Sequence, residues 1–272
     1  MPAKLRRPVL LAAGSLLAAA IAVPVGSAWA STPSNPGAHA QPRIVGGSEA
    51  SLADHPYAVY LTDQSGSQFC GAVIVSPSAV ATAAHCAKAL PKSSVHVVAG
   101  RQDKRGDDGV ELGVSRVWVN PDYSDPTKGD DIAVLTVRGR LPYRAAKLAD
   151  KNDQSLYAEG TQATVLGWGR LSEGGQRSDV LRSAQVPLVS DSTCKTAYDT
   201  YDPSSMVCAG YPQGGQDACQ GDSGGPLVEG DTLVGIVSFG DGCGKPGKPG
   251  VYTRVSQFSD DIAAQSQPRL FG

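Results

Sequence analysis

The sequence predicts an all-β protein, built either as a pair of barrels or as a large sandwich. Three observations support this fold class. The chain holds 32 glycines and 19 prolines but only 2 methionines, a composition typical of many turns and short strands rather than of a helical bundle. Short β-branched runs alternate with turn residues from residue 44 onward. The length of 272 residues is enough for one large domain or two small ones.

The overall composition excludes several classes of protein. With 41% hydrophobic and 18% charged residues, the chain fits neither a disordered tail nor a collagen-like fibre. The formal net charge is −2 and there is no long basic run, so nucleic acid is not an expected partner. Beyond the first thirty residues no apolar stretch reaches about 20 residues, so no membrane span is expected there.

Residues 1–30 have the pattern of an export signal peptide. Positive charges at residues 4–7 precede an apolar stretch from Val9 to Val25, and residues 28–30 give a small-x-small cleavage pattern. An uncleaved anchor helix is the alternative, which Pro24 disfavours because it shortens the continuous apolar run. The pair at residues 6–7 leaves the twin-arginine route open.

Residues 31–43 are expected to be an activation propeptide. The segment is rich in proline, serine and alanine and holds too few large apolar groups to fold alone. All 6 cysteines lie downstream of it, and an even number in an exported chain predicts three disulfides. The expected working domain, residues 44–272, has a formal charge of −6, so the mature protein is acidic.

The predicted strands are short apolar runs separated by loops. The clearest lie at 73–75, 95–98, 114–119, 132–137, 164–166 and 233–237. Turn-forming residues mark loops at 103–109 and 244–250. Only the end of the chain is predicted to be helical, because Val255, Phe258 and Ile262 fall on one helical face.

The strongest chemical signal is the run Gly221-Asp222-Ser223-Gly224-Gly225-Pro226. Flanking glycines leave the serine hydroxyl uncovered and let a carbonyl substrate approach the backbone. Gly221 and Ser223 can also direct two backbone N–H groups at one developing oxyanion. Taken alone, such a pattern is often just a turn, so the interpretation depends on finding a base for the serine.

His85 is the candidate base among 4 histidines. It lies in Thr82-Ala83-Ala84-His85-Cys86, where small residues and a cysteine would hold its backbone near the core. His39 lies in the expected propeptide, and His55 and His96 are interpreted as packing or surface residues. A buried histidine with a local hydrogen bond is the alternative for His85.

Asp131 is the candidate carboxylate that holds the imidazole tautomer. It precedes the apolar run at 132–135, so the start of that strand can draw its side chain inward. Its neighbour Asp130 would then face the other way, because side chains alternate along a strand. The alternative is a solvated acidic residue at the start of a strand.

The order His85, Asp131, Ser223, together with the run at 44–47, resembles the trypsin branch of the chymotrypsin-type serine proteases. The resemblance covers essentially all of residues 44–272 and is nearer to bacterial trypsins than to vertebrate ones. It implies two six-stranded antiparallel β-barrels with a C-terminal helix, and a secreted serine endopeptidase. It implies His85 as base, Asp131 as its orienter, Ser223 as nucleophile, and the N–H groups of Gly221 and Ser223 as oxyanion hole. The implied disulfides are Cys70–Cys86, Cys194–Cys208 and Cys219–Cys243.

The resemblance also implies a pocket for a cationic side chain. Asp217, six residues before Ser223, matches its floor, and a buried carboxylate there selects a cation. The other matching substrate-binding positions are Ala218, Gln220, Ser238, Phe239, Gly240 and Gly250. Ala218 replaces a serine found in many trypsins, which predicts cleavage after arginine in preference to lysine. Phe239 departs from the usual tryptophan, which leaves the preference for neighbouring substrate residues open.

The Arg43–Ile44 bond matches the activation site of that family. Cutting it would create an α-ammonium on Ile44, which is expected to pair with Asp222 and order the pocket. The uncut chain is therefore expected to be nearly inactive. Because Arg43 suits the predicted pocket, self-activation is one route and another protease is the alternative.

No cofactor is expected for this chemistry. Asp103, Asp107, Asp108 and Glu111 gather in one loop, which is either a solvated acidic loop or a structural calcium site. The expected partners are protein or peptide substrates and protein inhibitors of proteases, and the expected state is a monomer. Rival interpretations are a catalytically silent binding module, and a narrow regulatory enzyme instead of a broad digestive one.

Overall fold

A computed structural model describes residues 45–267 of the chain. The predicted signal peptide and propeptide, Arg43 and Ile44 all lie outside the described residues. The described strands are β1 (Ser48–Glu49), β2 (Ala58–Thr62), β3 (Gln68–Ser76), β4 (Ala79–Thr82), β5 (His96–Ala99), β6 (Val110–Val119), β7 (Ala133–Val137), β8 (Lys147–Leu148), β9 (Gln162–Gly167), β10 (Arg182–Pro187), β11 (Met206–Ala209), β12 (Pro226–Glu229), β13 (Thr232–Phe239) and β14 (Gly250–Arg254). The helices are α1 (Ala84–Ala89), α2 (Asp191–Ala197) and α3 (Val255–Ser266), with 3-10 turns at Lys92–Ser94, Pro126–Lys128 and Gln154–Tyr157.

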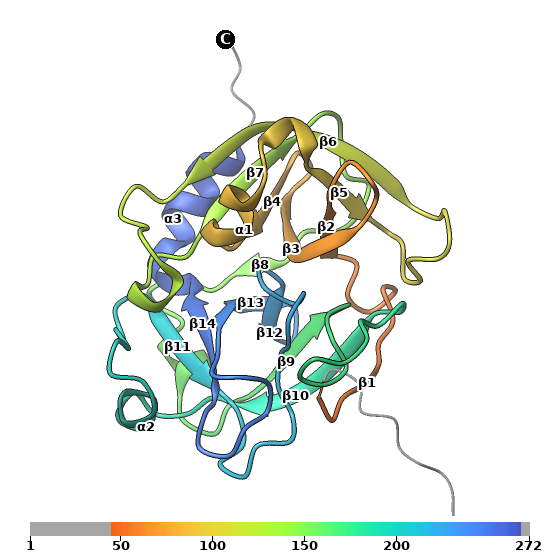
Figure 1. The fold of residues 1–272 in the computed structure, drawn as a ribbon. Helices are drawn as coiled ribbons and strands as arrows, with labels where there is room; N and C mark the ends of the chain where they lie inside the picture. The colour runs from red at the N-terminus through yellow and green to blue at the C-terminus, as the bar shows by residue number, and fades with distance from the viewer. Residues whose placement is uncertain (1–44, 268–272) are drawn as a thin grey trace, which may run out of the picture. The chain divides into compact units, whose positions relative to one another are not determined.

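The first half of the described chain forms a closed antiparallel barrel in the order β2-β3-β4-β7-β6-β5, seen in the upper part of Figure 1. β2 and β4 are buried along their whole length. Alternate residues of each strand face the narrow barrel interior, and the alanines, the valines and Leu61 of these strands belong to the same hydrophobic core as Ile74, Val97 and Leu135. Small and β-branched side chains suit such a narrow interior, because they pack closely on a pleated surface.

The second half forms a sheet of eight strands that is nearly a second barrel. Six of its strands follow the path β10-β9-β12-β13-β14-β11. Its two ends meet in a single isolated bridge, Leu188 with Ala209, supported by the Val189 N–H on the Cys208 carbonyl at 3.0 Å. β1 adds to one edge, and β8 pairs with β13 in parallel. The all-β class and the six strands expected for the second barrel are confirmed, but its last contact is one bridge instead of a ladder.

The helices are more numerous than the sequence predicted. α3 is confirmed, and its residues Val255, Phe258 and Ile262 are buried against the core of the first barrel. α1 and α2 were not predicted, and the expectation of a helix only at the C-terminus is wrong. They span 6 and 7 residues, too short for a helical hydrophobic period to emerge. Within residues 45–267 no helix has the length and apolar character to cross a membrane.

Three disulfides join these elements in the pairing that the resemblance implied. Cys70–Cys86 connects β3 to α1, and Cys194–Cys208 connects α2 to β11. Cys219–Cys243 connects two loops of the second half. Each crosslink closes a loop of the unfolded chain and is worth about 2–4 kcal/mol.

Candidate active site

The side chain of Asp131 lies at the centre of the site, where the two halves of the fold meet. Its carboxylate is 1% exposed and accepts three hydrogen bonds. The His85 backbone N–H donates to Oδ1 at 2.9 Å, and His85 Nδ1 lies 2.8 Å from Oδ2. The Ser238 hydroxyl, from β13 of the second half, also donates to Oδ2, at 2.6 Å. The predicted pairing of His85 with Asp131 is therefore present.

The start of α1 explains why His85 is held at this carboxylate. A helix leaves its first N–H groups without partners, and the residue before α1, Ala83, has no side chain that could cap them. Asp131 takes this role from another segment by accepting the His85 N–H. Because a carboxylate only accepts, Nδ1 must carry the proton, which leaves Nε2 as the proton acceptor.

The separation of Asp130 from Asp131 has a different cause from the one predicted. β7 begins only at Ala133, so strand alternation does not reach the two carboxylates. Asp130 instead adopts a left-handed conformation with φ of 54°, which aspartate tolerates better than most residues. Burial raises the pKa of Asp130, but only Asp131 faces His85.

Ser223 lies in a tight loop that the glycines around it make possible. Its carbonyl accepts the Gly71 N–H at 2.7 Å, which holds the loop against β3. Gly224 has a φ of 82°, and a Cβ there would overlap the Thr82 hydroxyl. The loop therefore requires glycine at this position, as the motif predicted.

Ser223 and His85 approach each other beside the Cys70–Cys86 disulfide. The Cys86 sulfur lies 3.5 Å from His85 Nε2 and 3.4 Å from the Ser223 carbonyl oxygen. Within residues 45–267 no direct hydrogen bond joins the Ser223 hydroxyl to Nε2. Such bonds are often long before substrate binds.

The two cysteines and His85 also form the sole cluster of potential metal ligands in this part of the chain. Because both sulfurs are in a disulfide, that cluster lacks thiolate ligands.

The backbone before Gly221 is held in one orientation. Gly221 has a φ of 101°, which glycine adopts at no steric cost. The preceding carbonyl, of Gln220, accepts the Arg170 N–H at 2.9 Å. Because a trans peptide is planar, its N–H points opposite to its carbonyl. The Gly221 N–H is therefore directed away from Arg170.

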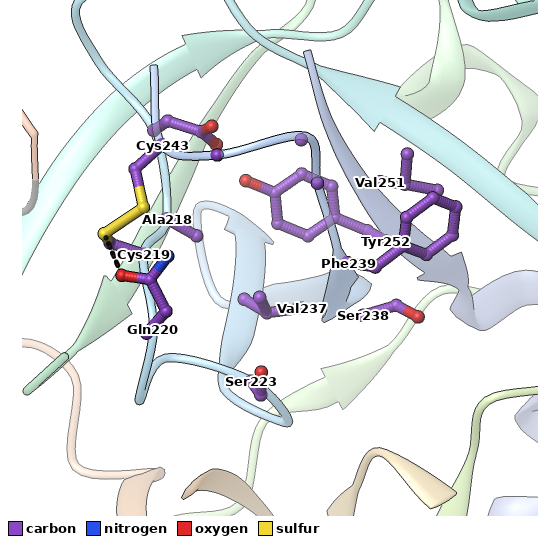
Figure 2. A pocket seen from close by; sticks show the side chains of 14 residues that line it. Ala218, Cys219, Gln220, Ser223, Val237, Ser238, Phe239, Cys243, Val251 and Tyr252 are labelled. Atoms are coloured by element: carbon purple, nitrogen blue, oxygen red, sulfur yellow. Dashed lines mark hydrogen bonds between the residues drawn. A yellow bond between two sulfur atoms is a disulfide. The ribbon is translucent and has the colours of Figure 1, made fainter. Parts of the chain in front are cut away.

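A cavity of about 210 Å³ opens beside Ser223, and Figure 2 shows it from close by. The Cys219–Cys243 disulfide lies on one side of it and the ring of Tyr252 on the other, with Ser223 below them in that view. All seven predicted substrate-binding residues line the cavity: Asp217, Ala218, Gln220, Ser238, Phe239, Gly240 and Gly250. Lining residues that the sequence did not predict for this role are Cys219, Val237, Gly242, Cys243, Val251 and Tyr252. These residues lie in the same strands and loops as the predicted lining residues. Their proximity in sequence to those residues is the one signal that could have indicated that they line the pocket.

Asp217 is a buried carboxylate at this cavity. It is 4% exposed, and its Oδ2 accepts the Gly244 N–H at 3.0 Å. In the described part of the chain its Oδ1 has no hydrogen-bond partner, and neither has the Tyr252 hydroxyl. Burial raises the pKa of Asp217 to about 7. A Cβ at Gly250 would lie 2.6 Å from Oδ1, so any larger residue there would crowd the carboxylate.

Phe239 packs edge-on against Tyr198, with ring centroids 5.6 Å apart. The Tyr198 hydroxyl donates to the Pro249 carbonyl at 2.8 Å, and the Lys248 ammonium lies 5.1 Å from its ring centroid. Tyr198 therefore links Phe239 to the loop that ends at Gly250. The sequence carried no motif that indicates this tyrosine.

Asp222 is fully buried beneath the Ser223 loop. Its two oxygens accept the Gly169 N–H at 2.7 Å and the Cys219 N–H at 3.0 Å. Burial raises its pKa to about 6. Among the ion pairs of residues 45–267 none includes this carboxylate. Its predicted partner, the Ile44 amine, lies outside the described residues.

The acidic loop at 103–111 already carries cations of its own. Arg105 pairs with Asp103 at 2.5 Å, and Arg101 donates to the Asp108 carbonyl at 2.9 Å. Asp107 is exposed, whereas Glu111 lies in β6 and not in the loop as predicted, at 4.0 Å from Arg101. Calcium binding by this loop stays a prediction.

The remaining described histidines lie away from these groups. His55 Nδ1 contacts the Tyr57 hydroxyl at 3.0 Å, and burial lowers the pKa of His55. His96 begins β5, in the first barrel. Neither contacts Asp131 or Ser223 among the described hydrogen bonds, which agrees with their interpretation as packing residues.

Comparisons with known proteins extend the likeness beyond the motif residues. A family model described as Trypsin matches residues 44–262. A trypsin of Saccharopolyspora erythraea is 48% identical over 222 residues, which cover 82% of this chain and 97% of the relative. Trypsin eta of Drosophila melanogaster is 41% identical over 236 residues, covering 82% and 88% of the two chains. Trypsin-1 of Astacus astacus is 40% identical over 244 residues, covering 82% and 100%.

Proposed function

Because this chain belongs to the trypsin family of serine endopeptidases, we propose that it cleaves proteins and peptides after arginine, and less efficiently after lysine. The observation that carries the proposal is the buried carboxylate of Asp217 in a cavity that opens at Ser223. One of its oxygens has no hydrogen-bond partner in the described chain. A cationic side chain that enters this cavity would supply the missing donors.

In the proposed reaction the Ser223 hydroxyl adds to the scissile carbonyl carbon while His85 Nε2 takes its proton. The carbonyl electrons move to oxygen, and the N–H groups of Gly221 and Ser223 stabilise that oxyanion. The C–N bond then breaks, His85 returns the proton to the leaving amine, and an acyl-serine remains. A water molecule, deprotonated by the same imidazole, repeats the steps and releases the new carboxyl terminus. Asp131 holds the required tautomer throughout. No step uses a cofactor.

The preference for arginine follows from Ala218, which lines the cavity next to Asp217. Its methyl group cannot accept a hydrogen bond. An arginine fork can bind a carboxylate with two parallel hydrogen bonds, whereas a lysine ammonium gains from additional acceptors. Substrate backbone would lie along residues 238–240, whose main-chain groups do not depend on the identity of residue 239.

We further propose that the protein is exported and made as an inactive precursor. The signal pattern at residues 1–30 supports export. Support for activation at Arg43–Ile44 comes from the first described residues. The Val45 carbonyl accepts the Asp217 N–H at 3.3 Å, and the Gly46 carbonyl accepts a hydrogen bond from Gln216 Nε2 at 3.1 Å. This segment thus adjoins the loop that carries both Asp217 and Asp222, where a new ammonium would find the buried Asp222.

The test is hydrolysis by the full chain after cleavage at Arg43–Ile44 with immobilised trypsin, which is then removed. Titration of the active-site serine, followed by assays on matched arginyl, lysyl and aromatic amides, should give the highest kcat/KM for arginine. A chain that does not titrate would instead be a silent binding module. Preference for aromatic residues, or equal rates on arginine and lysine, would contradict the assigned pocket.

Cleavage mapping on a random peptide pool separates a broad digestive enzyme from a narrow regulatory one. Loop shape outside the pocket decides that difference. A broad enzyme would cut at most arginines in the pool, whereas a narrow one would show strong preferences at neighbouring positions. Protein inhibitors that present an arginine to the same pocket are the further partners that we propose.

A further inference from the structure

A polar cluster lies behind Gly221 and takes no part in the reaction as described. Gln68, the first residue of β3, is buried with 5% of its surface exposed. Its side-chain amide connects two other segments. Nε2 donates to the Gly221 carbonyl at 3.1 Å, and Oε1 accepts from Lys104 Nζ at 2.7 Å. A lysine of the first half is thereby linked, through one glutamine, to the glycine of the oxyanion hole.

The chemistry of these groups allows only one orientation of the Gln68 amide. An ammonium has donors only, and a backbone carbonyl only accepts. Lys104 must therefore face the amide oxygen, and the NH₂ group must face Gly221. Lys104 and the Gly221 carbonyl therefore select the same orientation from opposite ends of the amide, and without Lys104 the amide oxygen would lose its donor and the side chain one of its two anchors.

Gly221 needs such an anchor because its backbone is intrinsically permissive. Glycine populates both signs of φ with similar ease, so the peptides on either side of Gly221 can rotate unless they are held. Arg170 holds the peptide before it, through the Gln220 carbonyl at 2.9 Å. Gln68 holds the peptide after it, through the Gly221 carbonyl. The Gly221 N–H belongs to the first of these two peptides. The second peptide, held by Gln68 and by the Asp222 N–H on the Cys219 carbonyl at 2.9 Å, restrains the rotation of Gly221 between them.

Lys104 is itself placed by contacts with the second half. Its backbone N–H donates to the Asp179 carbonyl at 2.8 Å, and Nζ also reaches the Trp168 carbonyl at 3.4 Å. No ion pair among residues 45–267 includes Lys104. Burial lowers its pKa to about 8, and the charged groups that face it are Arg177, Asp179 and Asp222. Partial burial of the Lys104 ammonium carries a desolvation cost. Its hydrogen bonds to the Gln68 side chain and the Trp168 carbonyl offset that cost, so both contacts are expected to persist.

We propose that Lys104, acting through Gln68, is a positioning residue for the oxyanion hole. It orients the Gln68 amide, which holds the Gly221 carbonyl and so keeps the Gly221 N–H directed at the developing oxyanion. The proposal rests on the proposed function, because it assigns a role within the same reaction.

The test compares the processed full chain with Lys104→Met, Gln68→Met and the double variant. Methionine matches glutamine in length and is one atom shorter than lysine, and in both positions it removes the polar contact. Deleting an oxyanion donor costs about 10²–10³ in kcat, so misdirecting one is expected to lower kcat by about tenfold, with KM nearly unchanged. The double variant should lose no more than Gln68→Met alone, because both changes break one linkage. Lys104→Arg, which keeps a cationic donor, should recover most of the loss.

Two inhibitors separate positioning from general damage to the fold. Benzamidine fills only the cationic pocket, whereas a peptidyl arginine aldehyde forms a hemiacetal with Ser223 whose oxygen takes the place of the oxyanion. The aldehyde should bind about tenfold more weakly to Lys104→Met while benzamidine binding is unchanged. Lys92→Met is the matched control, because Lys92 makes a similar contact to the Ser115 carbonyl, at 3.2 Å, on the exposed surface.

The outcomes are distinguishable. Unchanged kcat and aldehyde affinity in both variants would overturn the role of Lys104, even if the melting temperature fell. Additive losses in the double variant would show that Lys104 acts independently of Gln68, for example through its electrostatic interaction with Asp222. A wild-type chain that fails active-site titration would overturn the proposed function and this inference together.

Discussion

Asp217 is the residue whose ionisation sets what the pocket binds. Burial raises its pKa to about 7, so a large part of the free enzyme carries a neutral Asp217 near neutral pH. A bound cation favours the ionised form and therefore lowers that pKa. Binding must then be accompanied by release of a proton, and it must weaken as pH falls below the pKa of the free pocket.

We therefore predict that the dissociation constant of benzamidine rises about tenfold per pH unit between pH 7 and pH 5. Calorimetry in two buffers of different ionisation enthalpy would measure both the affinity and the released proton. Asp217→Asn is the control, which should bind weakly with no pH dependence in this range. A wild-type affinity that stays constant down to pH 5 would show that Asp217 is ionised throughout.

Ala218 is the second residue on which specificity depends. Replacing it with serine adds a hydroxyl beside Asp217, where it can accept from a lysine ammonium. Hydrogen bonds to charged groups contribute about 1.5–3 kcal/mol. We expect Ala218→Ser to raise kcat/KM for lysyl substrates by about tenfold relative to arginyl ones. Rates on matched arginyl and lysyl amides give the ratio directly, and an unchanged ratio would exclude this origin of the preference.

At the scale of single elements, α3 is the helix that packs against the first barrel. Val255, Phe258 and Ile262 pack into the barrel core, and Arg116 of β6 donates to Gln265 Oε1 at 2.7 Å. The chain thus returns from the second half to cover the first. Much of the stability of the first barrel is expected to depend on residues that are far away in sequence.

We predict that Ile262→Ala destabilises the protein by about 2–5 kcal/mol, the usual cost of deleting a fully buried isoleucine side chain. Urea denaturation followed by fluorescence would measure the change. Asp261→Ala, one position earlier on the exposed face of the same helix, should shift stability by about 0.5 kcal/mol or less. Equal effects of the two substitutions would mean that α3 is not part of the core.

At the scale of the whole molecule, activation couples the N-terminal segment to the Ser223 loop. Asp222 is buried with its oxygens on two backbone N–H groups. An ammonium on Ile44 would give this carboxylate a counter-ion, and the amine would gain a pKa above its ordinary value of about 7.7–8.0. A raised amine pKa means that the stabilisation is fully present below the ordinary value and is lost as pH rises through the raised one.

The activated enzyme should therefore lose kcat/KM reversibly as pH rises through the raised pKa of the Ile44 amine, which lies above about 8. A pH profile from 7 to 11 checks this, with return to pH 8 as the test of reversibility. Acetylation of the Ile44 amine should reduce activity at every pH. An acetylated enzyme with full activity would contradict the pairing with Asp222.

The precursor offers a second test at this scale. Ser223→Ala removes the nucleophile while leaving the Arg43–Ile44 bond in place. Incubated alone, this variant should stay uncut, and a trace of active wild-type enzyme should cleave it after Arg43. Mass spectrometry of the new N-terminus gives the answer. If the variant stays intact in the presence of wild-type enzyme, activation requires another protease.

Part of this protein could be predicted from local patterns. Short β-branched runs indicated strands, the run at 221–226 indicated a reactive serine, and the order of His85, Asp131 and Ser223 indicated the family. The first two features depend on neighbours in sequence, which a pattern records directly, and the third depends on a resemblance to known proteins. The helices α1 and α2 were not predicted, because two turns are too short to show a hydrophobic period.

Sequence alone thus determined the all-β class, the family and the residues expected to carry the chemistry. Only the tertiary structure decided how distant segments meet. It showed that Asp131 accepts the His85 N–H in the first turn of α1, that Tyr252 and Tyr198 support the pocket, and that Gln68 bridges Lys104 and Gly221. The physical reason is that a hydrogen bond between residues far apart in the chain leaves no periodic trace in the sequence. Its partners become recognisable only when folding brings donor and acceptor within about 3 Å.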